Sequence, residues 1–157
     1  MSDAHPPTSA PASTDTVERE AIVASLASLS LPLMWSLRQR ARQVFEPFGM
    51  RPTRVLLMEL VDRGIDSPSQ IAELLEAVPP AVTAIVNELI ERGWLERASD
   101  PNDRRRVHLH LTAPGRGALH DMRSAWTDAS RRDLERIDID DVRAVLRVFT
   151  RLLEGQP

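Results

Sequence analysis

Three consecutive arginines, Arg104, Arg105 and Arg106, follow the turn-forming cluster "SDPND" and precede the alternating segment "VHLHLT". A guanidinium group is planar, stays charged and presents a fork of donors. These properties suit it to phosphate and to a narrow minor groove, where the electrostatic potential is most negative. The alternative interpretation is a solvated cluster that keeps a hairpin tip hydrated.

The segments on either side of the arginines, "WLERA" and "RVHLHLT", alternate like half-buried strands, and Asp, Pro and Asn between them favour a turn. We therefore predict a β-hairpin with the arginines at its tip. Its second strand is expected to turn Val107, Leu109 and Leu111 toward the core. His108 and His110 then lie on the other face with Arg106. Two imidazoles without a third ligand are a weak metal signal, so we expect no metal and no cofactor.

The helix predicted before the hairpin, "VPPAVTAIVNELIERG", has few side chains that can bind a base. Thr83 can bond a base or a phosphate, or be a plain surface residue, and Asn87 can pair with an adenine edge. Pro80 and Ala81 can contact a thymine methyl group. No basic residue precedes Arg92, so we expect weak base readout. The outward positions are Pro80, Ala81, Thr83, Ala84, Asn87 and Glu88.

The segment "SPSQIAELLEA" predicts another short helix. Ser67 is its expected N-cap, Pro68 takes the first helical position, and Gln70 completes a capping box. A helix start offers backbone amides to phosphate. Ser69 and Gln70 are therefore candidate phosphate contacts.

The charge balance limits the class of partner. The chain has 157 residues, a net charge of −3 and no cysteine, so disulfides and thiolate metal sites are excluded. Residues 51–112 carry eight arginines and ten acids, a difference of −2. Any nucleic-acid interface must then be a local patch. We find no nucleophile with a base and no glycine-rich phosphate loop, and we expect no enzyme.

The chain divides into four predicted parts. Residues 1–15 read as a disordered tail, and residues 16–48 as an N-terminal helix that Pro32 kinks or breaks. Residues 49–112 contain three short helices and the hairpin. Residues 113–157 hold two helices, one from a Thr112 cap to about Ile137. No run of about 18 apolar residues exists, so we expect a soluble, cytoplasmic protein without a membrane segment.

The order helix, helix, helix, hairpin is that of a winged helix-turn-helix, whose third helix lies in the major groove of double-stranded DNA. The fold class is thus mainly α with a small β-hairpin. The flanking helices have apolar faces that this small module cannot cover. Burying them against a second copy gives a homodimer with two reading heads, which suits a pseudo-palindromic operator.

The motif "DPNDRR", an alternating strand and "LTAPGR" resemble the MarR family of transcriptional regulators, most densely from Arg51 to Leu119. The resemblance implies N- and C-terminal dimerisation helices, repression, and release by a small, often aromatic, effector. It also implies that Asp103 holds the turn, that Arg105 enters the minor groove and that Arg104 binds phosphate beside it. Arg106 stands where the family has a small or apolar residue.

The resemblance also assigns further positions. Ala84 stands where the family often has an arginine, and Arg54 lies on a helix that faces phosphate in related folds. Related regulators hold their ligands near the end of the first long helix. The candidate ligand-binding residues there, which can equally form dimer core, are Met34, Trp35, Arg38, Phe45 and Phe48.

The sequence therefore predicts a DNA-binding repressor that a small ligand releases. Arg38 beside Trp35 suits an anionic aromatic ligand. The alternative is a protein-interaction module whose DNA-reading helix has degenerated. The scarcity of base-binding side chains on the outward face of residues 79–91 favours it.

Overall fold

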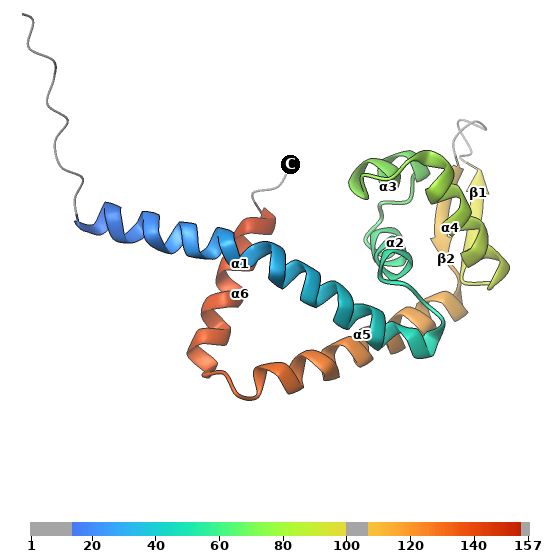
Figure 1. Cartoon of the computed structure of the whole chain (residues 1–157). Helices are drawn as coiled ribbons and strands as arrows, with labels where there is room; N and C mark the ends of the chain where they lie inside the picture. The colour runs from blue at the N-terminus through green and yellow to red at the C-terminus, as the bar shows by residue number, and fades with distance from the viewer. Residues whose placement is uncertain (1–13, 100–106, 155–157) are drawn as a thin grey trace, which may run out of the picture. The chain divides into compact units, whose positions relative to one another are not determined.

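The computed structural model describes residues 14–99 and 107–154. They form helices and one two-stranded antiparallel sheet, as the sequence predicts. The elements, drawn in Figure 1, are α1 (Thr14–Phe45), the 3-10 helix η1 (Glu46–Phe48), α2 (Pro52–Asp62), α3 (Pro68–Leu74), α4 (Pro79–Glu91), β1 (Leu95–Ser99), β2 (Val107–Leu111), α5 (Ala113–Leu134) and α6 (Ile139–Glu154).

Two compact units divide the chain, one up to Arg40 and the other from Ala41 onward. In the first unit α1 runs through Pro32 without a break, so the break is excluded and the predicted kink stays a prediction. Proline removes one backbone donor, and the turns on either side keep their own hydrogen bonds. The large apolar side chains of this unit are exposed, among them Leu26, Leu29 and Trp35.

The segment Thr14–Phe48 is also long and apolar enough, by length and composition, to cross a membrane, with a mean hydropathy of 1.4 over its best window. This differs from the expectation that the chain has no segment of that kind. Serines interrupt the apolar run but add no charge, so the mean hydropathy stays high although no continuous run exists.

The core of the second unit lies between three short helices, the hairpin and the first half of α5. Helices α3 and α4 pack on each other, α2 packs on β2 and α5, and α4 packs on β1. This arrangement leaves one face of α4 free beside the hairpin (Figure 1). The most deeply buried side chains are Leu57, Met58, Ile71, Val82, Val86, Leu89, Leu95, Leu109, Leu119 and Met122.

The hairpin pairs Leu95 with Leu111 and Arg97 with Leu109. Leu109 and Leu111 are buried, as alternation predicts. Val107 is 36% exposed, which corrects its assignment to the core. It pairs with Ser99, the last pair of the ladder before the residues that connect the two strands.

The base of the hairpin is fixed to α5 by a very close backbone contact. Thr112 caps α5 as predicted, accepting a hydrogen bond from the Gly115 amide at 3.0 Å and donating to the Gly93 carbonyl at 2.6 Å. The Thr112 amide donates to the Trp94 carbonyl at 3.1 Å. A Cβ atom on Gly115 would lie 2.0 Å from that carbonyl oxygen. Only glycine fits there.

We predict that Gly115→Ala lowers the free energy of unfolding by about 2 kcal/mol or more, because backbone atoms must separate to admit a methyl group. Gly117→Ala is the matched control, since its Cβ would meet nothing within 4 Å in the same helix. That change should be neutral or stabilising by up to ~1 kcal/mol. Urea denaturation of both variants measures the difference, and equal stabilities would contradict the close contact.

Candidate nucleic-acid interface

Helix α4 presents an exposed face that contains the predicted base-reading positions. Val82, Val86 and Leu89 form its buried stripe. Pro80 and Ala81 begin the exposed face, as predicted. Ala84, Thr83 and Asn87 continue this face, whereas Glu88 is half-buried at its margin.

The hydroxyl of Thr83 donates a hydrogen bond to the Pro79 carbonyl, one turn back along the helix, at 3.0 Å. Its proton is thus engaged within α4. The oxygen remains an acceptor, so Thr83 suits a donor group on a base better than a phosphate oxygen.

Asn87 is held by an arginine that the sequence analysis did not assign to the interface. The Nη2 of Arg97 in β1 donates to the Oδ1 of Asn87 at 2.8 Å. Both side chains are exposed. Strand alternation could have predicted this position for Arg97. Side chains two residues apart leave a strand on the same face, and Leu95, two residues before Arg97, faces the core and the helices.

Arg54 lies in an internal ion pair. Its Nε and Nη2 donate to Glu88 Oε2 at 2.7 and 2.6 Å. Arg92 approaches the other oxygen of Glu88 at 3.4 Å. The Arg54 hydrogen bond holds the pKa of Glu88 below its usual range, so this carboxylate stays ionised and paired. A phosphate contact by Arg54 would have to compete with Glu88.

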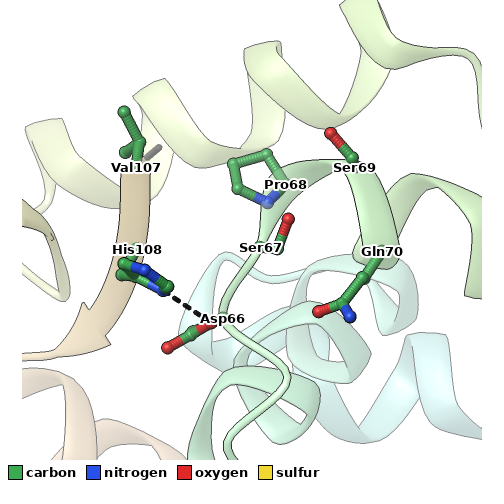
Figure 2. A pocket seen from close by; sticks show the side chains of 7 residues that line it. All are labelled: Asp66, Ser67, Pro68, Ser69, Gln70, Val107 and His108. Atoms are coloured by element: carbon green, nitrogen blue, oxygen red, sulfur yellow. Dashed lines mark hydrogen bonds and ion pairs between the residues drawn. The ribbon is translucent and has the colours of Figure 1, made fainter. Parts of the chain in front are cut away.

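A hollow of about 560 Å³ lies between the start of α3 and β2 (Figure 2). Ser69 and Gln70 line it with exposed side chains, in keeping with their predicted access to phosphate. Ser67 is the N-cap of α3, but its side chain makes no cap hydrogen bond, so the predicted capping box is wrong. Pro68 at the first helical position has no amide hydrogen, which leaves fewer helix-start donors to satisfy.

His108 ties β2 to the loop before α3. Its Nδ1 lies 3.0 Å from Asp66 Oδ1 (Figure 2), and the Leu109 amide donates to the Asp66 carbonyl at 3.0 Å. The hairpin is thereby anchored to α3 as well as to α5. His110 is exposed. Within residues 14–99 and 107–154, no three His, Asp or Glu side chains gather in a way that can hold a metal ion.

The arginine cluster of the hairpin tip remains a sequence-based prediction. Asp103, Arg104, Arg105 and Arg106 lie outside the described residues. In the sequence they connect β1, which ends at Ser99, with β2.

A second cavity, of about 240 Å³, opens between the end of α1, α2 and α5. Phe45 lines it, and its ring lies 5.9 Å from that of Trp126. Phe48 packs against the core, and Met34, Trp35 and Arg38 lie exposed in the N-terminal unit. The lining is mostly apolar and comprises Ala41, Phe45, Pro52, Val55, Leu56, Glu59, Met122, Arg123 and Trp126.

The arginine at this cavity is held by two carboxylates. Arg123 donates to both oxygens of Glu59 at 2.8 and 2.7 Å, and to Asp62 at 2.7 Å. These hydrogen bonds raise the pKa of Arg123 above its usual value, so it stays charged. Met122, Arg123 and Trp126 were not predicted at this cavity, because α5 lies far along the chain from the end of α1.

Comparisons with known proteins agree with this geometry. A model of the MarR family matches residues 48–106. The transcriptional repressor MprA of Escherichia coli K12 is 27% identical over 126 residues, which is 71% of this chain and 72% of that protein. A putative transcriptional regulatory protein for the hcr operon of Thauera aromatica is 33% identical over 86 residues, or 54% and 51% of the two chains.

Two solved structures share the fold. A MarR family protein from Bacillus stearothermophilus superposes with a TM-score of 0.75 at 17% identity, covering 86% of this chain and 95% of its own. A mutant MarR from E. coli complexed with operator DNA has a TM-score of 0.67 at 18% identity, covering 83% and 95%. With the hairpin packed beside α4, these findings support a MarR family winged-helix regulator, and members of that family are transcriptional regulators, not enzymes.

Proposed function

We propose that the chain is a homodimeric repressor that places α4 in the major groove of a pseudo-palindromic operator. Binding of a small ligand releases the dimer from the operator. The observation that carries this proposal is the exposed face of α4, on which Thr83, Asn87 and Arg97 offer polar groups beside the hairpin. One relative is named a transcriptional repressor, and one structural neighbour was solved with operator DNA.

The hairpin tip is the proposed second contact. In this assignment Arg105 enters the minor groove, Arg104 and Arg106 lie against phosphate, and Asp103 holds the turn. The antiparallel pairing of β1 and β2 supports it, because the residues between Ser99 and Val107 connect the two strands. Ser69 and Gln70 are exposed at the start of α3 and are proposed to meet the backbone of the DNA.

The exposed apolar faces of α1 and α6 support a dimer. Leu26, Leu29, Leu146 and Phe149 are each more than half exposed. A monomer in water would leave these faces hydrated, and a second copy can cover them. Burial between two copies accounts for the apolar composition of α1 without a membrane, so we place the protein in the cytoplasm, where its DNA is.

The cavity beside Phe45 and Trp126 is the proposed effector site. Its volume of about 240 Å³ and mostly apolar lining suit a small aromatic molecule. Glu59 and Asp62 already saturate Arg123. We therefore favour an uncharged aromatic ligand over the anionic one that Arg38 suggested.

We predict that Arg105→Ala weakens binding to the DNA flanking the gene and to random DNA alike, since the lost contact reads groove width and charge. The slope of log affinity against log salt should become shallower by about one unit. Asp103→Ala should be milder. Fluorescence anisotropy at several salt concentrations measures both.

Arg132→Ala, at an exposed position of α5, is the control for the loss of one positive charge. If Arg105→Ala matches this control in affinity and slope, the hairpin tip is only a solvated cluster. If the unaltered chain shifts no DNA even at low salt, the protein-interaction alternative replaces the proposed function.

For the dimer, we predict a species of twice the 17.6 kDa chain mass in sedimentation equilibrium at micromolar concentration. Deleting residues 140–157 or introducing Leu146→Asp should give monomer or aggregate, because either removes apolar surface from α6. Arg151→Asp, on the polar side of α6, should leave the dimer intact. A stable dimer after the deletion would rule out a role for α6.

For the effector, we predict that phenol or a neutral phenolic compound raises the melting temperature of the full chain and weakens its DNA binding. Leu56→Trp, which fills the cavity with an indole, should abolish both responses. Leu74→Trp at an exposed position of α3 is the matched control. Undiminished responses in Leu56→Trp would place the ligand elsewhere.

A further inference from the structure

Arg97 and Asn87 form one unit on the exposed face of α4. Arg97 lies opposite the buried Leu109 in the hairpin, so its side chain leaves the strand on the face that packs toward the helices. From there its guanidinium reaches Asn87 at 2.8 Å. Asn87 follows Thr83 by one helical turn, so both side chains lie on the same face.

Arg97 has a different hydrogen-bond partner from the neighbouring arginines. Arg54 and Arg92 both lie against the carboxylate of Glu88. Arg92 also donates to the Gly49 carbonyl and stacks on the ring of Trp94. Arg97, in contrast, is bonded to a neutral amide. It brings a positive charge to a helix that has no basic residue of its own before Arg92.

We propose that the Arg97–Asn87 pair determines base specificity and makes α4 select guanine over adenine at the base pair that it meets. This inference rests on the proposed DNA-binding function and goes one step further, to the chemistry of the site in the operator.

The reason is the direction of the hydrogen bond. An arginine has no acceptor, so the atom of Asn87 that faces it must be the oxygen, and the two amide hydrogens point away. An unpaired asparagine recognises adenine by accepting from N6 and donating to N7. With the guanidinium on the same oxygen, the N6 amino group would meet a competing donor and a positive charge.

Guanine presents two acceptors, O6 and N7, to the major groove. The amide hydrogens of Asn87 and the remaining hydrogens of Arg97 are all donors. The pair therefore complements guanine and opposes adenine at the same position. In this proposal Asn87 meets guanine in place of the adenine edge that the sequence suggested.

The test selects binding sites for the full chain from a library of randomised duplexes, then measures affinities for the selected duplex and for copies with a single guanine-to-adenine change. The variants are Arg97→Met, which keeps the aliphatic stem, and Arg97→Lys, which keeps a charged donor. Arg63→Met is the control for charge, at an exposed position at the end of α2. Circular dichroism melting verifies that each variant folds.

We expect one guanine in each half-site that the unaltered chain prefers over adenine by about 5-fold or more. Arg97→Met should lose most of that preference at this position alone, Arg97→Lys should retain it in part, and Arg63→Met should keep it. If Arg97→Met keeps the base preferences of the unaltered chain, or if adenine is preferred at every contacted position, the pair does not select guanine. Neither result would contradict the proposed DNA binding. A chain that binds no duplex would overturn the proposed function itself.

Discussion

The contact between the backbone of Gly115 and the carbonyl of Trp94 is the constraint on which the interface depends. Trp94 lies three residues after the end of α4, and its amide donates to the Leu89 carbonyl. The same residue precedes β1, and its carbonyl accepts from Thr112 at the start of α5. Helix α4, the hairpin and α5 are therefore joined within a few residues. The distance between Arg97 in β1 and Asn87 in α4 is set by this junction.

The distribution of charge explains how an acidic chain can present a DNA-binding face. Its net charge is −3, which opposes binding to phosphate as a whole. Several acids of the second unit are engaged internally: Glu88 with Arg54, Glu59 and Asp62 with Arg123, and Asp66 with His108. Arg97 contacts a neutral partner instead. Arg97 therefore places a positive charge beside the exposed face of α4.

Much of the fold follows from local sequence signals. Apolar periodicity, the prolines that open α3 and α4, and the Thr112 cap place the helices and the hairpin to within a few residues. Pro32 does not break α1, and Ser67 does not form a capping box. In both places the hydrogen bonds of the neighbouring turns outweigh the local sequence rule. The Arg97–Asn87 bond and the cavity beside Trp126 join residues from different elements. Pattern within one element cannot predict them, because packing between elements creates them.

The central claim is that two copies of the chain present α4 and the hairpin to two half-sites of one duplex. Hydroxyl-radical footprinting of the full chain on a selected duplex tests it directly. We predict two protected regions related by a dyad, with centres separated by about 10 base pairs or a multiple of that spacing. A single protected region, or protection without two-fold symmetry, would contradict the account.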